Sequence, residues 1–381
     1  ENQFEFKNDF KIPDFSSHQI TITNVKEKQD DVVESVTEII PKRRQRKRYR
    51  VKDFTYFKIL GRGQFGKVVL AKSNTSGKLC AIKIMKKKAN IDDHSIKELT
   101  QEKNMYIMAN QSNNPFLTKM FCSFHTRSRI YFVMEFASGG DLMFHVQKDI
   151  MRLKVARFFS AEILLGLKYL HEQGIVYRDL KLENVLLTKD GHIKIADYGL
   201  CKDNMSYGNF TSSFCGTADY MAPELVGNEQ YDKSVDWWAF GVLIYIMVLQ
   251  KTPFGNSADD ELELSNSILY DEPEFPKTMP YNLLYLISKL LTKNYKNRLG
   301  SSERDALEIM EQPFFESIDF EKLLNGEIES PFHIDVGDEM DANNFDDEFT
   351  SLALELSPVS SITETDQRVF SDFSRVCDPE F

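Results

Sequence analysis

Apolar positions follow two different periods along this chain. From Phe54, short runs rich in β-branched residues, FTYFKIL, KVVLAK and LCAIKIM, are separated by glycine-bearing turns and predict an antiparallel meander; SRIYFVMEF predicts a further strand. Residues 92–110 are expected to be helical, and the stretch VARFFSAEILLGLKYLHEQG, up to Gly174, carries apolar residues at helical spacing. Further helices are expected near 233–249, 281–292 and 303–312. We therefore expect an α+β fold in which a small β-rich lobe precedes a larger, mainly helical lobe.

The two ends of the chain are polar and differ in charge. Residues 1–53 predict a partly disordered extension, because apolar residues are sparse there and follow no sustained period. Eight basic residues and no acid lie between Lys42 and Lys52. This basic run, residues 42–52, could contact an anionic membrane surface, a nuclear import receptor or an acidic partner, or it could be a solvated linker. Residues 335–381 hold thirteen Asp or Glu against two Arg, and predict an acidic tail poor in structure.

Composition argues against several classes of protein. The formal net charge of −11 disfavours a nucleic-acid-binding fold, which carries a broad basic surface. The five cysteines are scattered without metal-binding spacing, which favours reduced thiols inside a cell. The longest uncharged apolar run, WWAFGVLIYIMVL at 237–249, has thirteen residues, whereas a membrane span needs about 20, so it predicts a buried helix. We expect a soluble, cytoplasmic protein, to which the basic run could add recruitment to a membrane or to the nucleus.

A glycine motif and a lysine point to a nucleotide. GRGQFGKV carries Gly61, Gly63 and Gly66, a spacing that alone could open a dinucleotide site or make a turn. Because a strand follows it instead of a helix, the motif favours a glycine-rich hairpin folded over phosphates. Lys83 lies in the apolar strand of AIK and needs a partner if it is buried. Glu102 is a candidate partner, and together they could hold α- and β-phosphates; the alternative is an exposed strand lysine.

The segments YRDLKLEN and ADYG carry the groups that phosphoryl transfer requires. Asp179 suits the carboxylate that orients the attacking hydroxyl and accepts its proton. Asn184 and Asp197 offer oxygen ligands to Mg²⁺, and Lys181 can neutralise the transferring phosphoryl group. Any one of these residues means little alone. Their order along the chain, after a glycine loop, a lysine and a glutamate, is a highly specific indication of phosphoryl transfer.

These motifs, together with APE and DWWAFG, resemble the eukaryotic protein kinase family over residues 54–314. GDLMFH, GHIKIADYGLCKD, FCGT, RLGSSERDA and NFDDEFT resemble the AGC group within it, on the protein kinase C and protein kinase N branch, and most resemble fungal-type protein kinase C. The resemblance implies a bilobal Ser/Thr kinase that uses ATP and Mg²⁺. It places an N-lobe at 54–137, a C-lobe at 138–314 and, at 315–381, a tail that wraps around the N-lobe. Glu224 of APE would pair with Arg298.

The resemblance also implies roles for single positions. Met134 would lie beside the adenine, with backbone groups of Glu135 and Ala137 at the hinge. Asp141 and Glu183 would meet the ribose and basic side chains of a substrate, so acceptors near Arg or Lys are expected; Asp141 could equally be a helix N-cap. The positions implied to bind ATP are Leu60, Gly61, Gly63, Gly66, Val68, Ala81, Lys83, Glu102, Met134, Glu135, Ala137, Asp141, Asn184 and Asp197.

Regulation is implied in the segment between DYG and APE. Ser213, directly before FCGT, would be phosphorylated by an upstream kinase, with Arg178 as the charge partner of the phosphate. Thr217 would contact Asp179. The alternative is that these are ordinary loop hydroxyls. Tyr198 follows Asp197, where phenylalanine is commoner.

The acidic tail carries two further implied phosphorylation sites. Ser357 precedes a proline, and Ser374 follows the aromatic pair Phe370 and Phe373 in RVFSDFSRV. By resemblance, the two aromatic side chains would dock beside the helix that carries Glu102. Burial of each would contribute about 1.5 to 3 kcal/mol at most, less the cost of ordering the tail.

Overall fold

The structure, a computed structural model, describes residues 48–381 apart from 64–65, 88–91, 256–259, 339, 341, 356–361 and 379–380. Contacts divide the chain between Gln45 and Arg46, and the fold reported below is that of the second unit. The predicted disorder of residues 1–47, the first part of the basic run and the predicted phosphorylation site Ser357 lie outside the described residues.

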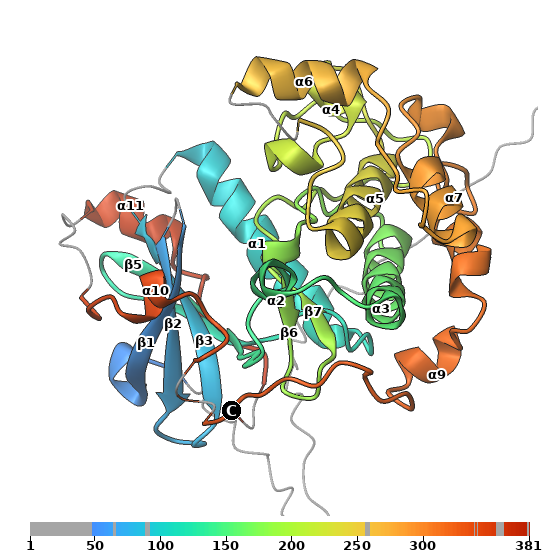
Figure 1. The fold of residues 1–381 in the computed structure, drawn as a ribbon. Helices are drawn as coiled ribbons and strands as arrows, with labels where there is room; N and C mark the ends of the chain where they lie inside the picture. The colour runs from blue at the N-terminus through green and yellow to red at the C-terminus, as the bar shows by residue number, and fades with distance from the viewer. Residues whose placement is uncertain are drawn as a thin grey trace, which may run out of the picture. The chain divides into compact units, whose positions relative to one another are not determined.

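The β-rich lobe is built on a six-stranded sheet in the order β1-β2-β3-β5-β4-β8 (Figure 1). Its strands are β1 (Phe54–Gly63), β2 (Gly66–Ser73), β3 (Leu79–Lys86), β4 (Met120–His125), β5 (Arg129–Glu135) and β8 (Arg375–Val376). All neighbours pair antiparallel, which confirms the predicted meander of the first three strands. Strand β8 comes from the acidic tail, so the prediction of a structure-poor tail is wrong at this point.

Alternation along the strands places apolar side chains on both faces of the sheet. On β2 and β5, Leu70 and Phe132 belong to the main core, whereas their neighbours Val69 and Val133 belong to a second cluster on the outer face. Register places Val68 opposite Lys83. The sheet therefore has an inner face that continues into the rest of the core and an outer face with an aromatic cluster of its own.

Helix α1 (Asp93–Gln111) is the long helix of this lobe and carries Glu102. It begins at Asp92, whose side chain accepts a hydrogen bond from the Ser95 N–H group at 2.9 Å and so caps the first turn. Tyr106, one turn after Glu102, packs on Phe132 of β5 with 5.6 Å between ring centroids. This contact fixes the helix against the inner face of the sheet.

The second lobe is mainly helical. Its helices are α2 (Leu142–Lys148), α3 (Leu153–Glu172), α4 (Pro223–Val226), α5 (Ser234–Leu249), α6 (Glu261–Tyr270), α7 (Tyr281–Leu290), α8 (Ala306–Met310) and α9 (Phe320–Leu324). The strands β6 (Val185–Leu187) and β7 (Ile193–Ile195) form a small hairpin, and 3₁₀ turns lie at 51–53, 182–184, 218–220, 295–297 and 313–315. Helix α3 ends where the sequence predicts, just before Gly174, which adopts a φ of 69°.

Helix α5 contains the longest apolar run of the chain. Trp237 and Trp238 are fully buried, and fourteen of its sixteen residues are buried, so the helix is apolar all round and packs as a core helix. This confirms the interpretation from its length. Within the described part of the chain, no helix is both long and apolar enough to cross a membrane.

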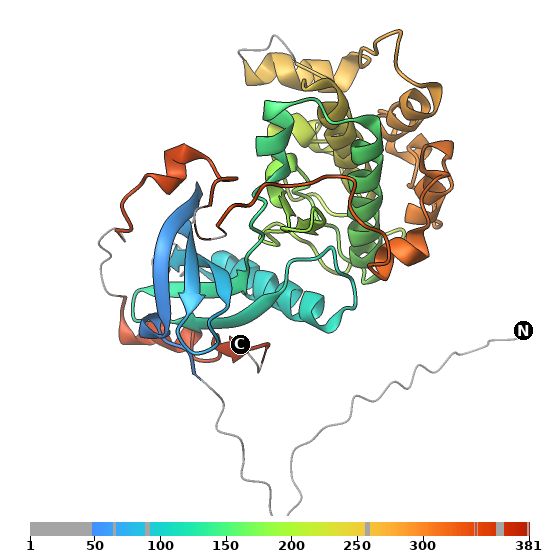
Figure 2. The same ribbon diagram turned by 60° about the horizontal axis from the view of Figure 1, so that its bottom comes forward.

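The acidic tail is ordered along much of its described length. It forms α10 (Asp347–Thr350), α11 (Glu364–Val369) and β8, and in Figure 2 it runs from α9 past α3 to the sheet. Gly140, at the junction of the lobes, has a φ of 74°, and a Cβ atom there would lie 1.9 Å from the carbonyl oxygen of Asn344. Only glycine fits this close approach, so the sequence of the hinge accommodates the tail.

Candidate active site

Three side chains from distant segments meet at one ammonium group. Lys83 on β3 donates from Nζ to Oε1 of Glu102 on α1 at 2.7 Å and to Oδ1 of Asp197, just after β7, at 2.9 Å. The Lys83 side chain is only 15% exposed, so the alternative of an exposed strand lysine does not hold. The sheet, α1 and the β6–β7 hairpin are thereby joined at the predicted phosphate site.

Burial and the neighbouring charges shift the pKa values of these three side chains in opposite directions. Burial lowers the pKa of Lys83, but Asp197 and Glu102 outweigh it, and the net pKa is raised. For Asp197, burial raises the pKa, yet Lys83 more than compensates and the net pKa is lowered. For Glu102, burial outweighs the attraction of Lys83 and leaves the pKa raised. The pair Lys83–Asp197 is therefore charged at neutral pH.

A second group surrounds the carboxylate of Asp179. Asn184 donates from Nδ2 to Oδ2 of Asp179 at 2.7 Å, and the Thr217 hydroxyl donates to Oδ1 at 3.1 Å. Lys181 Nζ lies 3.1 Å from Oδ2 of Asp179 and 2.9 Å from the Thr217 hydroxyl. The expected contact between Thr217 and Asp179 is present, and three polar groups hold the carboxylate in one orientation.

The loop that carries Asp179 is anchored by the first residue of the DWWAFG motif, to which the sequence assigned no role. Asp236 on α5 is fully buried and accepts hydrogen bonds from the N–H groups of Tyr177 and Arg178, both at 2.8 Å. Arg178 has a φ of 68°, a strained value for a non-glycine residue. His171 of α3 bonds the same carboxylate at 2.8 Å. An aspartate inside an otherwise apolar helix was the available signal, because a buried charge needs partners.

The glycine-rich hairpin contains two kinds of glycine. Among the described residues, no atom lies within 4 Å of a Cβ placed at Gly61 or Gly63, so their packing does not require glycine at either position. At Gly66 a Cβ would lie 1.9 Å from the carbonyl oxygen of Ile84, so the β2–β3 pairing itself requires glycine there. The need to leave space for a ligand can therefore explain glycine at positions 61 and 63 but is not required to explain it at position 66.

The expected adenine positions lie between the sheet and the hinge, residues 135–140. Leu60, Ala81, Met134 and Ala137 are buried; the first three belong to the main core, and Val68 packs against it. Ala81 lies opposite Met134 in the β3–β5 register. These apolar side chains come from four neighbouring strands and the start of the hinge.

Carboxylates of the hinge region have partners of their own. Glu135 accepts from Lys194 Nζ and from the Lys119 N–H group, at 2.9 and 2.7 Å. Asp141 is the N-cap of α2 and accepts from Phe144 N–H at 2.9 Å. The helix-cap interpretation of Asp141 is therefore correct, and it leaves the ribose role open. Burial raises the pKa of Asp141 and likewise the pKa of Glu183.

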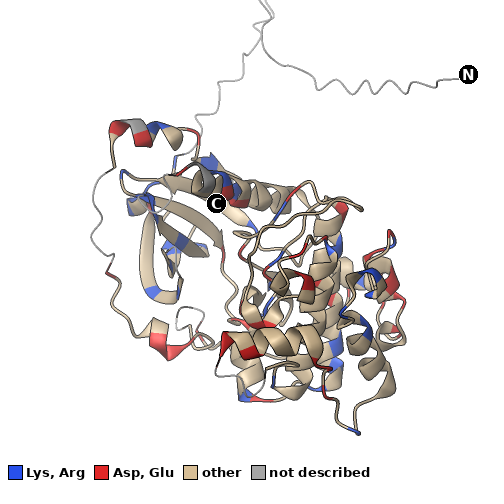
Figure 3. Cartoon of the chain, turned by 90° about the horizontal axis from the view of Figure 1, so that it is seen from above, with Lys and Arg blue, Asp and Glu red and all other residues tan. Residues whose placement is uncertain are grey.

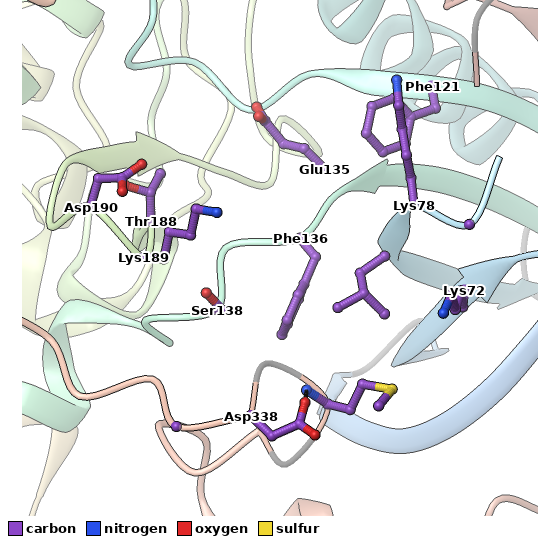
Figure 4. Close-up of a pocket in the computed structure, with 14 residues that line it drawn as sticks. Lys72, Lys78, Phe121, Glu135, Phe136, Ser138, Thr188, Lys189, Asp190 and Asp338 are labelled. Carbon is purple, nitrogen blue, oxygen red and sulfur yellow. Dashed lines mark hydrogen bonds between the residues drawn. The ribbon is translucent and has the colours of Figure 1, made fainter.

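A cavity of about 730 Å³ lies beside the hinge, between the β2–β3 turn, the β6–β7 turn and the tail (Figure 4). Phe136 stands between Lys78 on one side and Lys189 on the other. None of the described residues that line the cavity belongs to the groups around Lys83 and Asp179. The cavity is thus separate from the predicted phosphate site.

The segment with the predicted phosphorylation site lies on the surface. Ser213 is exposed, and its carbonyl accepts from the Tyr231 hydroxyl at 2.6 Å. Arg178, the expected partner of a phosphate, donates to the same Tyr231 hydroxyl at 3.0 Å and to the Leu200 carbonyl at 2.7 Å. Arg178 therefore reaches Ser213 through Tyr231, a link that the sequence did not reveal. Downstream, Glu224 and Arg298 form the expected buried, two-fold ion pair at 2.7 and 2.8 Å.

The aromatic pair of the tail is docked on the β-rich lobe. Phe370 and Phe373 are 2% and 5% exposed, and Phe373 packs on Phe132 of β5 with 5.3 Å between centroids. The Ser123 hydroxyl of β4 donates to the Phe373 carbonyl at 2.9 Å. Lys103, which follows Glu102 on α1, lies over the Phe373 ring. Ser374 is exposed beside this contact.

A buried lysine completes the docking site and was missed from the sequence. Lys87 is fully buried, and its Nζ donates to Gln367 of α11 at 2.7 Å and lies 4.5 Å from the centre of the Phe370 ring. The ring nitrogen of His125 is 3.0 Å away. Burial lowers the pKa of Lys87 to about 8. In the sequence, nothing distinguishes Lys87 from its exposed neighbour Lys86.

This arrangement defines a two-lobed phosphotransferase, and residues 54–315 match the family described as the protein kinase domain. Residues 336–374 match the protein kinase C terminal domain. The chain therefore belongs to the protein kinase family, and the predicted bilobal α+β kinase fold is confirmed.

Similar proteins indicate to which branch of the protein kinase family the chain is related. The chain is 49% identical, over 87% of its length, to Protein kinase C-like 1 of Saccharomyces cerevisiae, and 46% identical, over 90%, to Protein kinase C of Aspergillus fumigatus. It is 41% identical, over 87%, to Serine/threonine-protein kinase N2 of Danio rerio. The predicted protein kinase C and protein kinase N branch, and with it the serine/threonine kinase class, is confirmed. The matched region spans 29%, 31% and 34% of these three proteins.

Proposed function

We propose that this chain is an active Ser/Thr protein kinase that transfers the γ-phosphate of ATP to a protein hydroxyl. The observation that carries the proposal is the joint placement of Lys83 on both Glu102 and Asp197. A binding scaffold that keeps the fold without turnover would be expected to lack Lys83, Asp179 or Asp197. This chain has all three, and each lies among the partners that catalysis by positioning and charge requires.

The residues present fit ATP and Mg²⁺. The open space above Gly61 and Gly63 suits phosphates approached by the backbone. Among the described residues no group of three or more His, Cys, Asp or Glu could hold a metal ion. Mg²⁺ is commonly bound by one or two carboxylates together with substrate phosphates, so Asn184 and Asp197 suffice as protein ligands. When bound, Mg²⁺–ATP supplies the phosphoryl group and charge neutralisation.

The chain's own residues would then perform the transfer. Asp179 orients the acceptor hydroxyl and takes up its proton, and Thr217 and Asn184 keep the carboxylate pointed at the acceptor. Lys181 places a positive charge beside the group in transfer. Glu102 holds Lys83 towards the phosphates, so the position of α1 controls activity.

We further propose that substrates carry Arg or Lys near the acceptor. In support, burial raises the pKa of Glu183, and the nearby charges of Asp141 and Asp179 raise it further, so the two carboxylates lie close to each other and to Asp179. Lys and Arg, like Asp and Glu, are spread over both lobes (Figure 3). Phosphorylation of Ser213 by an upstream kinase, and of Ser357 and Ser374 in the tail, would regulate the enzyme. In support, Ser213 and Ser374 are exposed. The basic run would provide recruitment of a cytoplasmic enzyme to an anionic membrane or to the nucleus.

The experiment is ADP release with a basic serine peptide. Because general-base catalysis contributes about 10² to 10⁴, Asp179→Asn should lower the rate by at least about 100-fold. Asp190→Asn, an exposed aspartate in the β6–β7 turn, is the matched control and should leave the rate unchanged. Equal rates for wild type and Asp179→Asn would contradict the kinase proposal. Replacing the arginines of the peptide by glutamate tests the substrate preference and should raise its KM.

A further inference from the structure

The hydroxyl of Tyr198 is a polar group in a place where the commoner phenylalanine has none. Tyr198 is 1% exposed, and its oxygen lies 3.2 Å from the carbonyl oxygen of Thr118 and 3.2 Å from that of Ile195. Carbonyls only accept, so the hydroxyl donates.

The two carbonyls belong to the strand that leads to Asp197 and to the segment before β4 that is bonded to it. Ile195 ends β7, two residues before Asp197, and its carbonyl also accepts from the Thr118 N–H group at 3.0 Å. The Tyr198 side chain thus turns back onto the strand from which its own backbone departs. Asp197 lies inside this closed turn and has a φ of 53°, the left-handed region that a non-glycine residue rarely adopts.

Ring and hydroxyl have separable tasks. The Tyr198 ring packs edge-on against Tyr106 of α1, 4.8 Å between centroids, and lies 6.4 Å from the Tyr177 ring. A phenylalanine would keep both ring contacts. It would lose only the hydroxyl donor, which adds a side-chain link between residue 198 and the two segments that the backbone bonds of Ile195 already join.

We propose that the Tyr198 hydroxyl is a positioning group that holds Asp197 in the strained geometry in which its Oδ1 bonds Lys83. Resting on the proposed kinase function, the inference deepens it: the site is pre-organised for Mg²⁺–nucleotide before any ligand arrives. Without the donor, the backbone of Asp197 can leave the left-handed region, and the population with Asp197 turned towards the metal position falls.

The first test measures nucleotide binding by titration calorimetry in wild type and Tyr198→Phe. The probes are ADP with Mg²⁺ and ADP with a chelator. We expect affinity for ADP in Mg²⁺ to fall about three- to ten-fold, as for loss of one hydrogen bond, with affinity for metal-free ADP unchanged. Tyr245→Phe is the matched control, because it removes a buried hydroxyl that donates to the Glu274 carbonyl at 2.7 Å, away from the site. An unchanged ratio of the two affinities in Tyr198→Phe would overturn the inference.

The second test needs neither nucleotide nor turnover. Thermal unfolding of Tyr198→Phe, Asp197→Asn and the double variant forms a double-mutant cycle. If the hydroxyl acts through Asp197, the two shifts in Tm are non-additive; if it only stabilises the core, they add and the inference is overturned. Turnover of the wild type decides the proposed kinase function separately, so failure of one does not decide the other.

Discussion

His171, close to the end of α3, is a buried cation that fixes the loop carrying Asp179. Its Nε2 lies 2.8 Å from Asp236 and its Nδ1 3.2 Å from Asp305. Burial lowers the pKa of His171, but Asp305 and Asp236 outweigh it and raise the pKa from 6.5 to about 9. The imidazolium is therefore charged at neutral pH, and Asp236 is held in place to accept from the catalytic loop.

This raised pKa makes stability depend on pH. Because His171 binds its proton more tightly in the folded state, its contribution is complete below pH 6.5 and is lost as the pH rises through about 9. The contribution is on the order of 3 kcal/mol. Urea unfolding at pH 6 and pH 10 should show that His171→Gln destabilises strongly at the lower pH and much less at the higher.

Because variant and wild type are compared at the same pH, the contributions of other titrating groups, such as Lys87, cancel. His333→Gln, at an exposed histidine, is the control and should match wild type at both values. If the loss of unfolding free energy in His171→Gln were the same at pH 6 and pH 10, the histidine would act by its shape and not by its charge.

Single residues of the site differ in how far the sequence predicts them. Lys83, Asp179, Asn184 and Asp197 were found because chemistry fixes both their types and their order along the chain. His171 and Lys87 were not, since a histidine near a helix end and a lysine among lysines have no local signal. Their burial results from segments that meet only in the fold.

Elements follow the same division. Strands β1, β2, β3 and β5 and helices α3 and α5 were predicted because their apolar period buries one face or the whole element, whereas β4 (Met120–His125) was not predicted. The tail elements were not. α10 and α11 have four and six residues, and β8 has two, so none is stable without a partner surface. Only the resemblance placed the aromatic pair on the β-rich lobe.

Docking of the tail predicts a stability effect. Phe370→Ala with Phe373→Ala should lower Tm and ADP release together, because both buried rings, worth about 1.5 to 3 kcal/mol each at most, are lost next to α1. Loss of the contact with Lys103 also loosens the helix that carries Glu102. Val369→Ala is the matched control, since Val369 is 50% exposed in the same segment. If the double variant behaves like this control, the docked pair has no part in stabilising or regulating the enzyme.

Across the whole of the described molecule, both flanks of the kinase domain meet on the outer face of the sheet. Phe381 is fully buried and stacks on Phe121 at 4.2 Å between centroids. Tyr49, before β1, packs on Phe381 at 5.7 Å and on Phe54 at 5.9 Å. The packed part of the β-rich lobe thus already includes Tyr49, whereas the sequence predicted that the domain starts at Phe54. Residues more than three hundred positions apart share this cluster, which no local pattern predicts.

This cluster separates two functions within the basic run. Removing residues 1–45 spares Tyr49 and should leave Tm and ADP release unchanged, because the unit from Arg46 onward keeps its own contacts. Removing residues 1–52 deletes Tyr49, which is 6% exposed, and should destabilise the β-rich lobe by about 1.5 to 3 kcal/mol. In the full chain, Tyr49→Ala should reproduce that loss of Tm, whereas Arg48→Ala, at an exposed neighbour, should not.

Equal Tm values for the two truncations would mean that Tyr49 does not stabilise the β-rich lobe. A loss of binding to anionic vesicles already in the shorter truncation, at unchanged Tm, would assign recruitment to the charges and stability to the tyrosine.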